Sequence, residues 1–182
     1  MSEYMFNQIS ETHARKMARW LLAGLFVLRL LYLFPFTAEF DLAADESYYW
    51  DWGRRPDWGY YSKPPMIGWL MGLVGWLSSN SEFAIRLAAL GFGTVSLALI
   101  HALARRLYDD RTALLALLLV ALTPANMGLS LLFTIDAPLI LCWGAALLLF
   151  WRAFEKPASL TRWLGLMLII GLGNLSKQMM LV

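Results

Sequence analysis

The feature that most constrains this chain is the recurrence of long stretches in which charged residues are nearly absent. A helix that crosses a bilayer needs about 20 mostly apolar residues. Five stretches approach that length: 20–36, 83–104, 112–133, 137–151 and 163–182. The composition agrees, because 59% of the residues are apolar and 15% are charged, against about a half and about a quarter in soluble domains. We therefore expect an all-α integral membrane protein with about five transmembrane helices.

The same composition excludes several classes of protein. A chain this apolar is not expected to be disordered, and a net charge of +2 is too small to indicate a nucleic-acid partner. Cys142 is the only cysteine in the sequence, so no disulfide can form within the chain. The first apolar stretch could be the core of a cleaved signal peptide. It is long for such a core, and we interpret it as an uncleaved anchor.

The distribution of basic residues predicts the orientation. The run from Pro64 to Leu77 is short for a span and begins with paired prolines, which suit the start of a helix lying along the interface. If this run does not cross, residues 37–82 form an outer loop and nine basic residues fall on the inner side. These nine are Arg15, Lys16, Arg19, Arg105, Arg106, Arg111, Arg152, Lys156 and Arg162. The positive-inside rule favours this arrangement, with a cytoplasmic N-terminus.

The last apolar stretch reaches Val182 without a polar flank. We therefore expect the sequence to be the N-terminal part of a longer polypeptide whose C-terminal remainder is absent here.

Candidate functional residues gather at the outer side in this topology. Asp45 and Glu46 follow the first span, and Lys63 precedes the interfacial run. Asp136 lies in the next outer turn, and Lys177 lies toward the outer end of the fifth span. A sugar on a polyprenyl phosphate would present its reacting carbon at this level. Its leaving group is an anionic phosphate, which needs cations rather than a general acid.

The residues divide between two chemical roles. Lys63, Lys177 and Arg86 could bind the phosphate, and a carboxylate could accept a proton from the attacking hydroxyl or amine. Asp45 is the first candidate for that base, supported by Glu46 or Asp136.

Three motifs resemble a known family. They are Asp45-Glu46 followed by Tyr48-Tyr49-Trp50, the stretch Gly59-Tyr60-Tyr61-Ser62-Lys63-Pro64-Pro65-Met66, and Phe83-Ala84-Ile85-Arg86-Leu87. Together with Asp136-Ala137-Pro138, they resemble the dolichyl-phosphate-mannose-protein mannosyltransferase-like superfamily, whose bacterial members include the aminoarabinose transferase that modifies lipid A. The resemblance covers nearly the whole chain from Trp20 onward.

The resemblance implies a membrane glycosyltransferase of the C-type fold that uses lipid-monophosphate sugars and inverts the anomeric centre. It implies that Asp45 is the catalytic carboxylate, that Lys63 contacts the lipid phosphate and that Asp136 supports the site. Lys177 is likewise placed for the phosphate. Members of the family are several hundred residues long, so this chain alone could be inactive.

One departure bears on cofactors. Some relatives carry an acidic residue of a metal site where this chain has Ser62, a position that cannot ligate a metal strongly. No cofactor is therefore certain, although a divalent cation remains an option, and we assign no metal ligand.

Aromatic residues are dense in the outer loop and allow two interpretations. The candidates for stacking on a sugar ring are Tyr48, Tyr49, Trp52, Tyr60 and Tyr61. Tryptophan and tyrosine also gather at membrane interfaces without binding anything, and an interfacial belt is the favoured interpretation for most of them. In the same way, Asp45-Glu46 could simply stabilise the N-terminus of an interfacial helix.

Three functional hypotheses remain at this stage. The leading one is transfer of a sugar from a polyprenyl-phosphate donor to an acceptor lipid, glycan or protein, at the periplasmic face of a bacterial inner membrane. An endoplasmic reticulum membrane with a luminal site would give the same charge pattern. A transporter is the second, because Arg29 and Arg86 lie inside apolar stretches, where arginine is costly. The third is an inactive fragment of the transferase.

Overall fold

The computed structural model describes residues 10–181, and the regular structure in that range is helical throughout. The helices are α2 (Glu11–Glu39), α3 (Ala44–Gly53), α4 (Met66–Ser78), α5 (Glu82–Leu107), α6 (Asp110–Ala121), α7 (Pro124–Leu129), α8 (Asp136–Glu155) and α9 (Leu160–Ser176), followed by the 3₁₀ helix η1 (Gln178–Leu181). The predicted all-α membrane class is confirmed.

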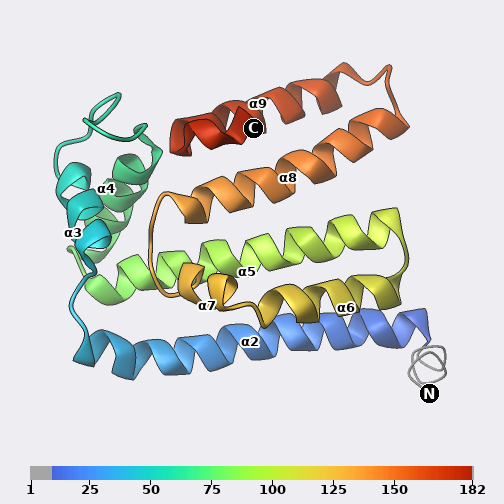
Figure 1. Cartoon of the computed structure of the whole chain (residues 1–182), viewed down its shortest axis with the longest axis horizontal. Helices are drawn as coiled ribbons and strands as arrows, with labels where there is room; N and C mark the ends of the chain where they lie inside the picture. The colour runs from blue at the N-terminus through green and yellow to red at the C-terminus, as the bar shows by residue number, and fades with distance from the viewer. Residues whose placement is uncertain (1–9, 182) are drawn as a thin grey trace.

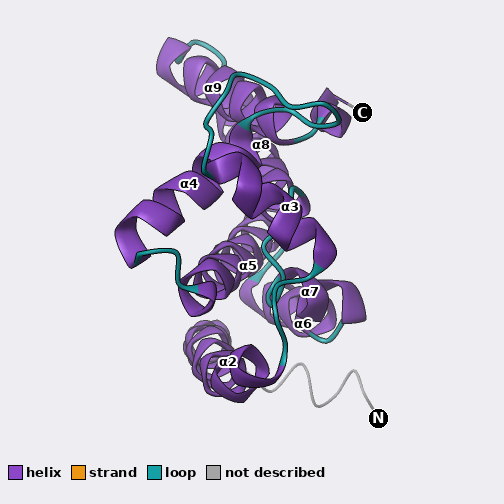
Figure 2. Cartoon of the chain, turned by 90° about the vertical axis from the view of Figure 1, so that its left-hand side faces the viewer, coloured by secondary structure: helices purple, strands orange, loops and turns teal. Residues whose placement is uncertain are grey.

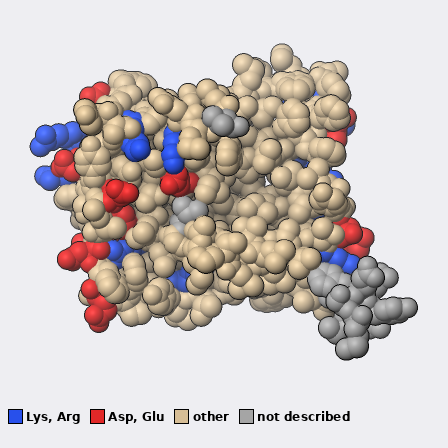
Figure 3. All heavy atoms as spheres, in the orientation of Figure 1, with Lys and Arg blue, Asp and Glu red and all other residues tan. Residues whose placement is uncertain are grey.

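Five helices lie side by side and form a layer, seen in Figure 1 in the order α2, α6, α5, α8 and α9. The short helices α3 and α4 cover one end of this layer (Figure 1). We call that end the outer end and the opposite end, which holds residues 105–111 and 152–162, the inner end. On the face drawn in Figure 3, charged side chains gather toward the two ends, with a broad uncharged band between them. The hydrocarbon of a bilayer matches such a band.

Three helices are long and apolar enough to cross a membrane by length and composition, namely α2, α5 and α8. The shorter apolar α9 has 17 residues and α6 has 12. The chain therefore has the helices of an integral membrane protein, and the count of five spans stays a prediction.

The stretch 112–133, expected to be one span, is divided into α6 and α7. Proline lacks the backbone N–H that a helix interior requires, and Thr123 starts a new helix at Pro124 by accepting a hydrogen bond from the N–H of Asn126. Arg29 of α2 points into the break. Its guanidinium donates to Ser130 Oγ at 2.6 Å, to Asn126 Oδ1 at 2.9 Å and to the carbonyl of Ala121. The intramembrane arginine thus satisfies polar groups that the broken helix leaves open.

Helices α3 and α4 approach each other closely enough that glycine is required where they meet. A Cβ atom on Gly53 would lie 2.6 Å from the backbone N of Gly72. One turn earlier on α4, a Cβ on Gly68 would lie 2.5 Å from the hydroxyl of Tyr60. The glycine pair of α4 therefore serves packing, as small residues at membrane-helix contacts commonly do.

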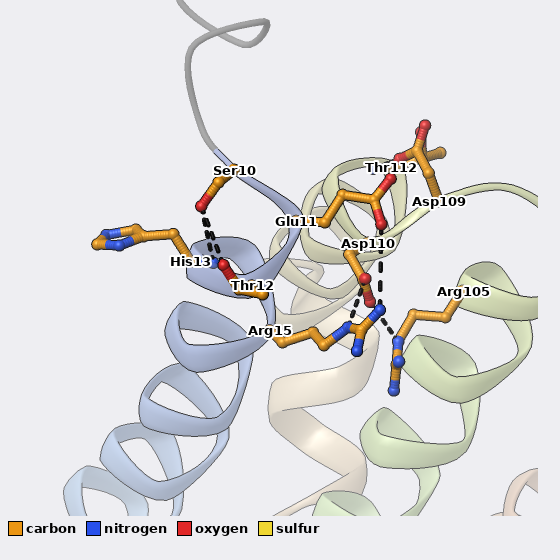
Figure 4. A network of polar contacts seen from close by, with 9 residues as sticks. All are labelled: Ser10, Glu11, Thr12, His13, Arg15, Arg105, Asp109, Asp110 and Thr112. Atoms are coloured by element: carbon orange, nitrogen blue, oxygen red, sulfur yellow. Dashed lines mark hydrogen bonds and ion pairs between the residues drawn. The ribbon is translucent and has the colours of Figure 1, made fainter.

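A buried carboxylate joins three helices at the inner end. Asp110 accepts hydrogen bonds from Arg15 Nε of α2 and Arg105 Nε of α5 (Figure 4). Burial of the carboxyl opposes its ionisation, but the hydrogen bonds and charges of the two arginines outweigh that effect. The pKa of Asp110 therefore lies below its usual value. The basic residues that predict the orientation also hold the helix ends together.

Replacing this carboxylate should cost stability in a pH-dependent way. We expect Asp110→Asn to lower the free energy of unfolding at pH 7 by about 2 kcal/mol, because two charge-assisted hydrogen bonds weaken. A depressed pKa stabilises the fold fully above the unfolded value, about 4, and that contribution is lost as the pH falls through the folded value. Thermal unfolding in detergent would be measured from pH 7 to pH 3. The difference in the free energy of unfolding between variant and wild type should become smaller below pH 4. Exposed Asp51→Asn serves as the control, and a gap independent of pH would contradict this account.

Candidate active site

The outer end holds the residues that the sequence singles out. Asp45 and Glu46 lie in the first turn of α3, Asp136 lies in the first turn of α8, and Lys177 follows the last residue of α9. Lys63 lies in the loop between α3 and α4. Figure 2 views the molecule from this end, with both short helices and their connecting loops toward the viewer.

The two adjacent carboxylates of α3 have opposite environments. Asp45 is exposed, whereas Glu46 is completely buried. Glu46 Oε2 accepts a hydrogen bond from the N–H of Ala43, and Oε1 accepts one from the N–H of Phe133, in the segment before α8. Glu46 thereby ties the start of α3 to the loop that leads to Asp136.

Arg86 of α5 completes the same cluster. Its side chain is 1% exposed, and it donates to the carbonyls of Phe40 and Asp41 at 2.8 and 2.7 Å. One of its nitrogens, Nη2, lies 3.8 Å from Glu46 Oε2. Arg86 and Glu46 thus lie beneath the surface on which Asp45 is exposed, and their contacts are with protein groups.

Asp136 and Lys177 form an ion pair, with 2.8 Å between Nζ and Oδ1. Beside it, the hydroxyl of Ser176 donates to the carbonyl of Ile135 at 2.7 Å, and Ser176 is fully buried. Two neighbouring contacts therefore join the start of α8 to the end of α9. They bring together two predicted site residues that are 41 positions apart.

A cavity of about 590 Å³ opens between the loop before α4 and the end of α9. Lys63 and Lys177 both line it, so two of the three predicted phosphate ligands face one space. Tyr60 and Tyr61 line the same space, as do Trp58 and Asn174. The cavity thus combines two cations with aromatic and amide groups.

The phenol of Tyr49, on α3, is affected by the charges of both Asp45 and Asp136. The ring is 4% exposed. Burial raises the pKa of its phenol, and the negative charges of Asp45 and Asp136 raise it further. The carboxylates of Asp45 and Asp136 therefore act on the same buried ring.

The five aromatic candidates for sugar stacking fall into three environments. Tyr60 and Tyr61 line the cavity, and Tyr61 is fully exposed. Tyr49 and Trp52 belong to the hydrophobic core, where Trp52 stacks on Tyr60 with 4.3 Å between ring centroids. Tyr48 is 43% exposed on α3 and also contacts Trp52.

Trp58 and Asn174 line the cavity but were not among the predicted site residues. Trp58 is 84% exposed and makes an edge contact with Trp69 of α4. Asn174 lies one turn before Lys177 on α9. An amide within an apolar helix is a sequence signal that could have identified Asn174. Trp58 had no signal that separated it from the other aromatic residues of the loop.

Within residues 10–181, no three side chains of His, Cys, Asp or Glu gather as a metal site would require. The divalent cation considered from the sequence thus has no such group of ligands in this part of the chain.

Comparison with known proteins places these features in a family. Residues 62–182 match the model of the family described as dolichyl-phosphate-mannose-protein mannosyltransferase. The chain belongs to this family. The matched region contains Lys63, Arg86, Asp136 and Lys177, while Asp45 and Glu46 precede it.

Three relatives of this chain come from bacteria. An undecaprenyl phosphate-α-4-amino-4-deoxy-L-arabinose arabinosyl transferase from Pectobacterium atrosepticum is 32% identical over 167 residues, which cover 81% of this chain and 30% of the relative. The transferase of the same name from Pectobacterium carotovorum is 31% identical, covering 84% of this chain and 30% of the relative. A lipid A galacturonosyltransferase from Rhizobium johnstonii is 50% identical over 48 residues, or 26% of this chain and 10% of the relative.

The chain thus spans about a third or less of the length of the curated relatives that it matches. No solved structure matches it.

Proposed function

We propose that this chain forms the donor-binding part of a membrane glycosyltransferase that moves a sugar from a polyprenyl-monophosphate donor to a hydroxyl or amine. The observation that carries the proposal is the cavity in which Lys63 and Lys177 meet beside Asp136. Two cations suit a phosphate leaving group, and aromatic rings on the wall suit a sugar. The names of the relatives support an undecaprenyl-phosphate donor and a lipid A acceptor.

The proposed reaction is a single displacement. Asp45 accepts the proton of the attacking group, whose oxygen or nitrogen bonds to the anomeric carbon while the bond from that carbon to the phosphate oxygen breaks. Attack opposite the leaving group inverts the anomeric centre. The distribution of the basic residues supports an outer site, and the bacterial relatives support a periplasmic face of an inner membrane.

The structure supports the transporter hypothesis less than it supports the transferase. Arg29 and Arg86 motivated it, and both guanidinium groups are engaged with protein carbonyls and side chains. Both arginines therefore have structural contacts that account for their presence in apolar stretches. We retain the transferase as the single candidate function.

Removing one cation of the cavity tests the proposal. We expect Lys63→Met to lower kcat/KM for a radiolabelled undecaprenyl-phosphate sugar about 10- to 100-fold, because a charge-assisted contact with the phosphate is lost. Transfer would be measured in membranes from cells that express the complete gene, with Lys156→Met at the inner end as the matched control. Unchanged transfer by Lys63→Met would overturn the assignment of the cavity. Parallel assays of residues 1–182 alone would show whether this part is active by itself.

A further inference from the structure

We infer that Lys177 exchanges partners during the reaction, from Asp136 to the phosphate, as the donor's glycosidic bond breaks. The inference rests on the proposed function and concerns how the same site handles charge. It assigns Asp136 the role of a competing anion that holds Lys177 until the phosphate gains its second charge.

The contacts around the pair allow the side chains to move while the backbone stays fixed. The buried bond between Ser176 Oγ and the carbonyl of Ile135 holds the ends of α9 and α8 together. The adjacent Asp136 and Lys177 side chains are 40% and 29% exposed. Exposed ion pairs stabilise a structure little, and typically change an equilibrium constant by less than about a factor of ten. A stronger anion can therefore displace the carboxylate.

Lys177 lies between two possible partners. One is the carboxylate of Asp136, 2.8 Å away, and the other is whatever occupies the cavity that Lys177 lines together with Lys63. Within residues 10–181, the structure shows no ion pair of Lys63. Among the described residues, the cavity therefore offers one cation without an ion pair, Lys63, and one that is paired, Lys177.

The charge of the phosphate changes during the transfer in a way that fits this arrangement. The donor's phosphate is a diester with one negative charge, which Lys63 can balance. When the bond to the anomeric carbon breaks, its electron pair stays on the phosphate oxygen and the acceptor's proton goes to Asp45. The product is a monoester with a charge of about −1.5 to −2. This additional charge attracts a second cation, and Lys177 can turn to it.

Binding of the product tests the exchange directly. Undecaprenyl monophosphate would be titrated against the protein expressed from the complete gene, in nanodiscs, with neutral undecaprenol as the reference lipid. We expect Asp136→Asn to bind the monophosphate about 5-fold more tightly than the wild type, because the competing carboxylate is gone. We expect Lys177→Gln to bind it about 10-fold more weakly. In the double variant, the gain from Asp136→Asn should disappear.

The control is Glu82→Gln, which changes the net charge as Asp136→Asn does but lies at the start of α5. Thermal unfolding of each variant would verify that it is folded. Unchanged or weaker binding by a folded Asp136→Asn variant would overturn the exchange while leaving the donor class intact. Failure of the wild type to prefer the monophosphate over undecaprenol would overturn the exchange and the proposed donor together.

Discussion

An Asp45→Asn variant is expected to transfer sugar about 100- to 10,000-fold more slowly than the wild type, the range that a positioned general base contributes. Asp45 is exposed at the outer end, and its neighbour Glu46 is buried and occupied by two backbone N–H groups. Asp45 is therefore the carboxylate of this motif that an acceptor can reach. Asparagine has nearly the same shape and cannot accept the proton.

The measurement is transfer from the radiolabelled donor in membranes that contain equal amounts of each variant. Asp51→Asn is the matched control, because Asp51 is an exposed carboxylate on the same short helix. Its Oδ1 lies 3.9 Å from Nη1 of Arg54. Binding of undecaprenyl monophosphate should be nearly unchanged by Asp45→Asn, which separates loss of the base from loss of the site. Full activity of Asp45→Asn would show that the base lies elsewhere.

An Arg86→Met variant is expected to lose about 3–5 kcal/mol of stability, because it leaves the carboxylate of Glu46 buried without its cation. The substitution also removes the donors to the carbonyls of Phe40 and Asp41. Restoring neutrality with Glu46→Gln in the same molecule should recover part of the loss. The double variant should therefore be less destabilised than the sum of the single variants.

The stability of both variants would be measured by thermal unfolding in detergent. The fraction of monodisperse protein is a second readout. Arg55→Met, at an exposed position of the outer loop, is the control. Stability within about 0.5 kcal/mol of the wild type, the range of ordinary surface changes, would show that the cluster does not hold the outer end together. In that case, Arg86 would again be a candidate ligand of the phosphate.

Much of the fold could be predicted because a bilayer imposes strong rules on a sequence. Apolar length identifies α2, α5 and α8, and the basic residues at 105–111 and 152–162 place the ends of the helices. The stretch 112–133 was expected to be one span, whereas the structure divides it at Pro124. A proline reveals that a hydrogen bond is missing, but it does not reveal that Arg29 of another helix satisfies the groups left open.

The site shows the same division between sequence and tertiary structure. The sequence alone determined the fold class. It also predicted the orientation, and it predicted that Asp45, Glu46, Lys63, Asp136 and Lys177 lie at one level, because hydropathy and charge act along the chain. Only the tertiary structure decided their environments: Glu46 and Arg86 are buried together, while Lys63 and Lys177 share a cavity. The physical reason is that burial and pairing depend on contacts between distant segments, which periodicity and spacing do not encode.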